Sequence, residues 1–250
     1  MKPIQRRSKI VETVDSHGAM SVDALASQFA VSPETIRRDL GHLADSGALQ
    51  KVHGGARPLR LHTEGSFGER MAEDAAAKLV IAGKLAQLVE PGDTVFIDTG
   101  STTVICARPL AAIGHLTVIT NSVRVAEIIA QTPTNTVYLL GGAFGGDNGE
   151  TTGPLVIDQI ALFQADHAII TVAAIDADVG AMDADFAEAQ VARAMIVASR
   201  QTVVLAHGTK LRRKAAFRIC RLDQIDVLVC DQTPDSGFLT SLHAAGCALP

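Results

Sequence analysis

Residues 94–103 read TVFIDTGSTT, and this stretch decides the fold class of most of the chain. A short run of apolar and β-branched residues leads directly into a polar loop with a glycine, as at the end of a buried strand. Five further runs rich in Val and Ile occur at residues 116–119, 136–140, 168–172, 202–205 and 226–229. Segments with helical spacing separate most of them. Apolar strands that alternate with helices predict a mostly parallel α/β sheet covered on both faces.

Polar and glycine-rich loops follow directly after most of these runs. They are residues 98–103, 120–122, 141–142, 175–176 and 207–210. Ligands bind at the carboxyl ends of the strands in an open α/β sheet, so we expect the loops to converge on one crevice. Capping or turn chemistry explains any single loop equally well. Several such loops at successive strand ends favour a ligand site.

The loop from Thr99 to Thr103 is suited to binding an anion. Gly100 lets the backbone approach a ligand closely, and hydroxyl donors follow at Ser101, Thr102 and Thr103. The next helix presents unpaired N–H groups at its positive end, so phosphate fits this loop best. Lys210 offers a positive charge to the same ligand. Side chains that can pair with sugar hydroxyls are Asp98, Asn121 and Asp176.

Other ligand classes lack their motifs. The chain has no GxxxxGK[ST] string, and residues 141–146 (GGAFGG) lack the GxGxxG spacing, which argues against ATP and NAD. The scattered cysteines and histidines form no CxxC or HExxH pattern, so no cofactor is predicted. One acidic group offers ligands for a divalent cation, although a solvated loop and helix start is the favoured interpretation. It comprises Asp176, Asp178, Asp183, Asp185 and Glu188.

Charge divides the chain into two parts. Residues 1–60 carry nine Lys and Arg against six Asp and Glu, whereas the remaining residues carry 13 against 21. A locally basic module attracts the phosphate backbone of nucleic acid, while the acidic remainder keeps the protein off random DNA.

Three helical patterns follow one another in the basic part. Their buried faces are expected at Ile10, Val11 and Val14, at Val22, Leu25, Ala26 and Phe29, and at Ile36, Leu40 and Leu43. A short turn around residues 30–31 separates the second pattern from the third. Residues 48–56 then have the pattern of a short β-hairpin. This order predicts a winged helix-turn-helix.

The third helix has the features of a recognition helix. Ser32 is a suitable N-cap, and polar side chains lie on the face away from the core at Glu34, Thr35, Arg37, Arg38 and His42. We expect Arg37 and Arg38 to contact base edges in the major groove, and Lys51 and His53 of the hairpin to contact phosphates. Exposed arginines often only solvate a helix. Here the caps, the short turn, the local charge and the hairpin coincide, which favours DNA binding.

The motifs of both parts resemble those of one family. Residues 6–10 (RRSKI), 32–40 (SPETIRRDL) and 52–56 (VHGGA) together resemble the DNA-binding domain of DeoR-family repressors. The strings DTGSTT, TNS, LLGG, AID, FAEAQVARAMI and GTK, with the pair Gly153-Pro154, resemble the family's sugar-phosphate-sensing domain. That domain is related to the folds of ribose-5-phosphate isomerase and CoA transferase. The resemblance implies operator binding by oligomers and release when an effector binds.

The same resemblance implies a set of residues that line the effector pocket. They are Asp98, Gly100, Ser101, Thr102, Thr103, Asn121, Gly142, Asp176, Glu188 and Lys210. Three positions depart from the family pattern. Ala174 replaces the usual glycine before the Ile-Asp pair, His207 replaces a frequent Asp, and Pro109 falls where the helix after the phosphate loop normally continues. These changes leave the phosphate loop intact and put in doubt the part of the pocket that contacts the sugar.

The expected organisation is a winged helix-turn-helix at residues 1–56, a linker at 57–68 and an α/β effector domain at 69–250 that begins with a long helix over residues 69–89. We expect a cytoplasmic protein without a membrane segment, because no apolar run approaches the roughly 18 residues that span a bilayer. Its expected partners are double-stranded operator DNA and a phosphorylated sugar or polyol effector, and its expected assembly is a homodimer or homotetramer.

The alternative function is that of an enzyme. A sugar-phosphate isomerase or a CoA-transferase-like enzyme with an accessory DNA-binding module would use the same pocket, with Asp98, Glu188 or Lys210 as acid or base. The fused DNA-binding module favours the regulator over the enzyme.

Overall fold

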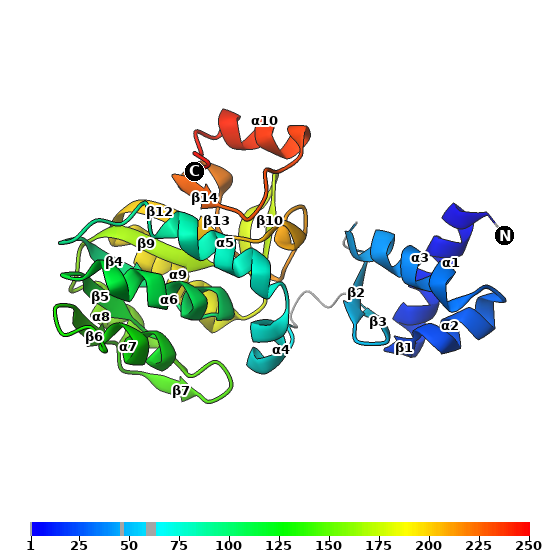
Figure 1. Cartoon of the computed structure of the whole chain (residues 1–250), viewed down its shortest axis with the longest axis horizontal. Coiled ribbons are helices and arrows are strands. Elements are labelled where there is room, and N and C mark those ends of the chain that lie inside the picture. Colours follow the sequence, from blue (N-terminus) through cyan, green and yellow to red (C-terminus); the bar gives the residue numbers. More distant parts are fainter. Residues whose placement is uncertain (1, 46–47, 59–63) are drawn as a thin grey trace. The chain divides into compact units, whose positions relative to one another are not determined.

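The computed structural model describes residues 2–45, 48–58 and 64–250. The chain divides into two compact units, Met1–Thr63 and Glu64–Pro250 (Figure 1). Within the predicted linker, Arg57 and Pro58 belong to the last strand of the first unit, and Phe67 begins the first helix of the second. Residues 59–63 lie outside the described residues.

The N-terminal unit is a helix-turn-helix followed by a hairpin. Its elements are α1 (Pro3–His17), β1 (Met20–Ser21), α2 (Val22–Phe29), α3 (Pro33–Asp45), β2 (Leu49–Val52) and β3 (Gly55–Pro58). Strand β3 pairs antiparallel with both β1 and β2. The predicted apolar faces form one core, to which α1 contributes Ile10, α2 Leu25 and α3 Ile36, all fully buried. The winged helix-turn-helix predicted from the sequence is confirmed.

Two glycines shape the turn of the hairpin. Gly54 has a φ of 75°, a left-handed conformation that glycine adopts without steric cost. A Cβ atom on Gly55 would lie 2.1 Å from the carbonyl oxygen of Met20, because β1 pairs closely with β3 at this point. The fold of the wing therefore requires both glycines of the VHGGA motif.

The second unit is built on a six-stranded parallel sheet. In sheet order its strands are β14 (Val227–Val229), β12 (Ser199–Leu205), β9 (Ala165–Thr171), β4 (Thr94–Ile97), β5 (Thr117–Thr120) and β6 (Thr136–Leu139). Every neighbouring pair is parallel. All six apolar runs predicted as strands belong to this one sheet, so the predicted mostly parallel fold is confirmed.

Helices cover both faces of this sheet (Figure 1). Val95 and Ile97 point to a core shared with α5 (Ala75–Leu85), α6 (Ser101–Ile113) and α7 (Val123–Ile129). Phe96 points to the opposite core, which α8 (Pro154–Ile160), α9 (Phe186–Val197) and α10 (Ser236–Ala244) help to form. Burial of each large apolar side chain contributes about 1.5–3 kcal/mol, so both faces stabilise the sheet.

Small antiparallel elements extend from the carboxyl ends of β6 and β9, and the sequence analysis did not predict them. Strands β7 (Ala143–Gly145) and β8 (Glu150–Thr152) form a hairpin. Strands β10 (Ala174–Asp176), β11 (Gly180–Asp183) and β13 (Phe217–Cys220) form a second sheet, and short 3-10 turns occur at Gly208–Lys210 and Leu222–Gln224. Their short and irregular apolar patterns do not stand out in the sequence.

One helix prediction needs correction. The long helix expected over residues 69–89 is in fact two helices, α4 (Phe67–Ala72) and α5, because Asp74 adopts a left-handed conformation with a φ of 51°. An Asp side chain tolerates this conformation better than most. Pro109 does not end the helix after the phosphate loop, since α6 continues to Ile113 with Pro109 inside it. Among the described residues, no helix is long and apolar enough to cross a membrane.

Candidate functional site

The N-terminus of α3 is fixed by two of the residues predicted to bind DNA. The Ser32 hydroxyl accepts a hydrogen bond of 3.2 Å from the backbone N–H of Thr35, and the two hydroxyls lie 2.9 Å apart. Capping of this kind typically stabilises a helix by about 1 kcal/mol. Ser32 and Thr35 therefore determine where α3 begins, which is the end that a recognition helix presents to DNA.

The basic residues of α3 and of the hairpin are exposed. Arg37 forms an exposed ion pair of 3.4 Å with Glu34, and Arg38 is exposed beside it. Surface pairs of this kind contribute little, about 0–1 kcal/mol, so Arg37 is easily redirected to a ligand. Lys51 and His53 are exposed in and just after β2. The structure leaves these four side chains accessible to a nucleic acid.

Two other arginines of the basic motifs form ion pairs within the N-terminal unit. Arg6 and Arg7 of α1 donate hydrogen bonds of 2.6 and 2.9 Å to the two carboxylate oxygens of Asp39 on α3. Burial opposes ionisation of Asp39, but the bonds from the two arginines outweigh it and lower the carboxyl pKa. The arginines at the start of the chain thus hold α3 in place, a role that the sequence analysis did not assign.

In the second unit, the end of β4 is bonded to the end of β9. The backbone N–H of Thr171 donates a 2.7 Å hydrogen bond to the Asp98 carboxylate, and the Thr171 hydroxyl donates to the carbonyl of Thr99 at 2.9 Å. Burial raises the pKa of Asp98 well above its ordinary value, and the hydrogen bond from Thr171 only partly opposes this. Asp98 is therefore a buried acid that joins two strand ends.

Helix α6 begins directly after this junction. Gly100 is its N-cap residue, and no side chain caps the helix end. A Cβ atom on Gly100 would lie 2.7 Å from the Thr171 hydroxyl, so the backbone can come this close only as glycine. The hydroxyl residues of the first turn, Ser101, Thr102 and Thr103, are all buried.

Three buried oxygen atoms at this edge of the sheet have no hydrogen-bond partner among the described residues. They are Oγ1 of Thr99, Oδ1 of Asn121 and Oε2 of Glu150. Thr99, Asn121 and Glu150 are each at most 6% exposed. Burying an unpaired polar atom costs about 1–3 kcal/mol, and such atoms are rare in folded proteins. Their gathering after β4, after β5 and on β8 marks a place where a polar ligand can supply the missing partners.

Acidic side chains line the neighbouring part of the site. The Asn148 amide donates hydrogen bonds to Glu188 at 2.8 Å and to Glu150 at 3.1 Å. Burial, with the nearby charges of Asp183 and Glu150, raises the pKa of Glu188, and burial likewise raises that of Asp183 to about 6. A carboxyl that stays protonated near pH 7, as that of Glu188 does, can donate a hydrogen bond, and it repels an anion less than a carboxylate does.

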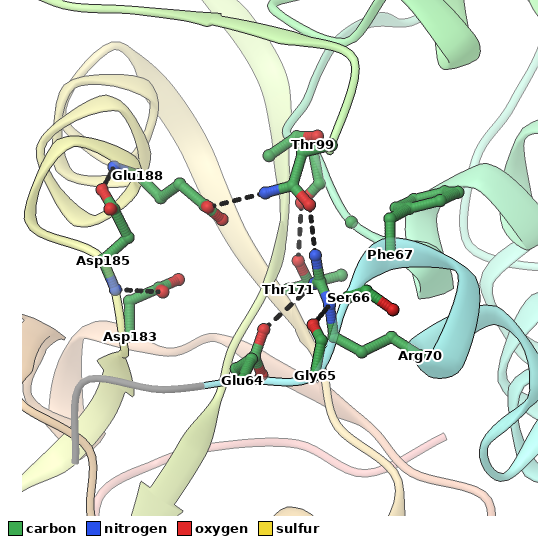
Figure 2. Close-up of polar contacts among 12 residues, drawn as sticks. Glu64, Gly65, Ser66, Phe67, Arg70, Thr99, Thr171, Asp183, Asp185 and Glu188 are labelled. Carbon is green, nitrogen blue, oxygen red and sulfur yellow. Dashed lines mark hydrogen bonds and ion pairs between the residues drawn. The ribbon is translucent and has the colours of Figure 1, made fainter. Parts of the chain in front are cut away.

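Positive charge comes from Lys210 and Arg70. The Lys210 ammonium donates to the backbone carbonyl of Val172 just beyond β9, and the Arg70 guanidinium donates to the side-chain oxygen Oδ1 of Asn148. Glu64 lies between them, with carboxylate oxygens 3.0 Å from the Arg70 guanidinium and 3.7 Å from the Lys210 ammonium. Figure 2 shows Glu64 joined to Arg70 by a dashed line, with Asp183, Asp185 and Glu188 on the other side of the view.

The structure brings most of the predicted effector residues to this edge, but not all of them. Asp98, Thr99, Asn121, Glu188 and Lys210 lie at or beside it, together with the first turn of α6.

Gly142 and Asp176 have other roles in the structure. A Cβ atom on Gly142 would lie 2.6 Å from the carbonyl oxygen of Thr152, so this glycine permits close packing. The Asp176 carboxylate accepts bonds from the backbone N–H groups of Asp178 and Val179 in its own turn.

The acidic group after β10 also needs correction. Asp183 is buried, and Glu188 is largely withdrawn from solvent, so neither belongs to a solvated loop. Asp185 does start a helix, since its carboxylate accepts hydrogen bonds from Ala187 and Glu188 at the N-terminus of α9. Among the residues that the structure describes, no group of three or more His, Cys, Asp or Glu side chains could hold a metal ion.

His207 is buried against the same edge. Burial and the nearby Lys210 lower its pKa to about 3, so the imidazole is neutral near pH 7. Its Nδ1 forms a 2.9 Å hydrogen bond with the Thr209 hydroxyl, which in turn donates to the Asp74 carboxylate at 3.1 Å. The substitution at this position thus places an uncharged ring beside Lys210.

Sequence reasoning missed several residues of the site, namely Glu64, Arg70, Asn148, Glu150 and Thr171. Glu64 lies in the predicted linker, and Arg70 lies in the predicted helix over residues 69–89, to which no site residue was assigned. Asn148 and Glu150 follow the glycine-rich stretch 141–146, and that position was the one available signal for them.

Comparisons with known proteins agree with both units. Residues 6–60 match the model of the DeoR-like helix-turn-helix domain, and residues 73–232 match that of the DeoR C terminal sensor domain. The chain is 32% identical over 238 residues to the HTH-type transcriptional repressor CsqR of Escherichia coli, covering 95% of this chain and 91% of that one. It is 33% identical to the Glycerol-3-phosphate regulon repressor of Haemophilus influenzae, covering 94% and 92%.

Two solved structures are similar to the chain at low sequence identity. The tetrameric eIF2B-beta2-delta2 complex from C. thermophilum is similar with a TM-score of 0.50 at 14% identity, over 97% of this chain and 70% of that one. Ribose 5-phosphate isomerase A from Methanocaldococcus jannaschii matches with a TM-score of 0.42 at 16% identity, over 56% and 55%.

The matched family models describe a helix-turn-helix and a sensor domain, and the similar curated proteins are repressors. The enzyme alternative is therefore not favoured. The chain belongs to the DeoR family of DNA-binding transcriptional repressors.

Proposed function

We propose that this repressor binds operator DNA through α3 and the hairpin, and that a phosphorylated sugar or polyol bound at the carboxyl edge of the parallel sheet controls this binding. The observation that carries the effector proposal is the group of three buried, unpartnered oxygens of Thr99, Asn121 and Glu150. Hydroxyl groups of a polyol can donate hydrogen bonds to all three. The uncapped N-terminus of α6 and the Lys210 ammonium supply positive potential for a phosphate.

The names of two relatives point to the same ligand class. The Glycerol-3-phosphate regulon repressors of Haemophilus influenzae and Escherichia coli are named for the regulon of a phosphorylated polyol. Asp98 and Glu188, whose pKa values are raised, suit the sugar end of such a ligand, because protonated carboxyls donate to hydroxyl oxygens. In this proposal Asp176 and Gly142 support the fold around the pocket.

On the DNA side, Arg38 and Arg37 contact base edges, while Lys51 and His53 contact phosphates. Glu34 holds Arg37 in the free protein and releases it when DNA is bound. We propose a homodimer or homotetramer, since paired recognition helices fit repeated half-sites. Because its partner is operator DNA, we place the protein in the cytoplasm.

The experiment that tests the effector proposal is a thermal-shift screen of the full chain against phosphorylated sugars and polyols, with the same compounds lacking phosphate as controls. The proposal requires at least one phosphorylated compound to raise the melting temperature while its unphosphorylated counterpart does not. Equal shifts for both members of every pair would refute it, as would turnover of a sugar phosphate.

A further inference from the structure

The segment that leads into the sensor unit is fastened across the candidate effector site. This strap, residues 64–72, contains Glu64 and helix α4. The backbone N–H of Phe67 donates a 3.0 Å hydrogen bond to Asp147, and the Arg124 guanidinium lies 4.2 Å from the centre of the Phe67 ring. A capping box between Ser66 and Glu69 fixes the start of α4. The strap is therefore held to the β7–β8 hairpin, which carries Asn148 and Glu150.

A buried lysine fixes the other end of the strap. Lys78 is 2% exposed, and its ammonium donates hydrogen bonds to the backbone carbonyls of Arg70 and Glu73, which end α4. Between these fixed points the Arg70 side chain extends into the site, where it contacts Asn148 and Glu64 (Figure 2).

The Glu64 carboxylate occupies the position of an anion in this site. Its oxygens face two cations, Arg70 and Lys210. Its negative charge also contributes to raising the pKa values of Asp183 and Glu188, which places it close to the acidic part of the site. A carboxylate paired with Arg and Lys satisfies the same donors that a phosphate group would use.

We propose that Glu64 is an internal competitor of the effector phosphate, which displaces it from Lys210 and Arg70 and thereby changes the strap. This inference rests on the proposed function and identifies how effector binding is passed on to the rest of the chain. A phosphate carries more charge than a carboxylate, about −1.5 to −2 near pH 7, and has three acceptor oxygens, so it can replace Glu64 on these cations.

The place of Glu64 in the chain gives this exchange a consequence. Glu64 is the first residue of the sensor unit, directly after the DNA-binding unit ends at Thr63. Displacing its carboxylate from the two cations would change the contacts of the residue at which the sensor unit begins, which is where the chain arrives from the DNA-binding unit. Linkage makes this effect reciprocal. If docking of Glu64 lowers the affinity for the effector by some factor, bound effector lowers the equilibrium constant for docking of Glu64 by the same factor.

The test compares binding of inorganic phosphate to the full-length wild type, Glu64→Gln, Glu90→Gln and Lys210→Ala, by isothermal titration calorimetry. Glu64→Gln removes the charge of the competitor and keeps its shape. Glu90→Gln is the matched control, an exposed Glu before the amino end of β4 and hence at the opposite edge of the sheet. Inorganic phosphate is the probe because it tests the cation pair without requiring the right sugar.

We expect Glu64→Gln to bind phosphate about twofold to fivefold more tightly than the wild type and Glu90→Gln, the range for losing an ion pair of up to roughly 1 kcal/mol. Lys210→Ala should bind it more weakly. If Glu64→Gln and the wild type have equal affinity while Lys210→Ala is weakened, the competitor role is overturned and the effector site stands. If Lys210→Ala is also unchanged, both the inference and the proposed phosphate position are overturned.

Discussion

Arg6 and Asp39, 33 residues apart in the sequence, are joined by a hydrogen bond of 2.6 Å between the Arg6 guanidinium and the carboxylate. Because Arg7 bonds to the other carboxylate oxygen, α1 holds α3 at both atoms of one side chain. Asp39 follows directly after the exposed Arg38, so adjacent residues of one motif have opposite tasks. Asp39 fixes the helix from inside, and Arg38 is free to meet DNA.

Asp39→Asn should destabilise the N-terminal unit by about 1–3 kcal/mol, because two guanidinium groups lose their charged partner. The lowered pKa of Asp39 sets the pH dependence. A carboxyl whose folded pKa is depressed stabilises the fold above its unfolded pKa, and that contribution is lost as pH falls through the folded value. Hydrogen exchange of α1 and α3 at pH 7 and at pH 3 measures this. Equal protection of variant and wild type at pH 7 would contradict the assignment.

Arg38→Ala should lose operator affinity by about 1–3 kcal/mol if the side chain contacts a base edge. Ligand-induced stabilisation of the sensor unit should remain. The control is Arg200→Ala, which removes an exposed arginine of the sensor unit that pairs with Asp166 at 3.4 Å. Footprinting of the two variants at one salt concentration decides the matter, and an unchanged footprint for Arg38→Ala would refute the base contact.

Lys210→Ala should weaken binding of a sugar phosphate roughly tenfold to 100-fold, the loss expected for one charge-assisted hydrogen bond. At a ligand concentration 100 times the Kd, the wild type should be stabilised by ~2.7 kcal/mol. The matched control is Arg108→Ala, an exposed cation two turns beyond the N-terminus of α6. Chemical denaturation with and without ligand gives these values. Equal ligand stabilisation in all three proteins would remove Lys210 from the site.

Glu188→Gln should make the sensor unit more stable at pH 8 than the wild type, by at least about 1 kcal/mol, and similarly stable at pH 4. Burial raises the pKa of Glu188 above its ordinary value of 4.5. Between the ordinary pKa of 4.5 and the raised pKa of about 10, the folded state keeps a proton that the unfolded state has released. The free energy of unfolding therefore falls as pH rises through this range. The glutamine oxygen still accepts the bond from Asn148. Parallel stability curves for the two proteins between pH 4 and pH 8 would argue against a buried acid here.

The sequence predicted the parts of the fold that repeat. Each strand of the parallel sheet is a short apolar run because both of its faces are covered, and runs such as 94–97 can be recognised without tertiary information. The helix-turn-helix was equally accessible, since its stripes follow helical periodicity. The break at Asp74 was not, because a single left-handed residue leaves no periodic signal.

The candidate site was only half accessible to sequence reasoning. Residues that directly follow a strand, such as Asp98 and Asn121, were found because the topology of parallel sheets places them at one edge. Glu64 and Arg70 belong to a segment that precedes β4, the first strand of the parallel sheet along the chain. Only the tertiary structure brings them to the same edge. The sequence favoured a solvent-exposed position for Glu188, because its side chain is ordinarily charged. In the structure the side chain is largely buried, which raises its pKa.

The most direct test of the account is an operator titration. The full-length protein would be titrated, at one fixed salt concentration, onto a DNA duplex that it has selected from a random pool, with and without the phosphorylated compound that stabilises it most. The account predicts that this compound weakens operator binding by roughly 5- to 150-fold, that its unphosphorylated counterpart has no effect, and that Lys210→Ala needs roughly tenfold to 100-fold more of the compound for the same response. An operator affinity that stays constant at saturating ligand would contradict the claim that the strand-end site controls DNA binding.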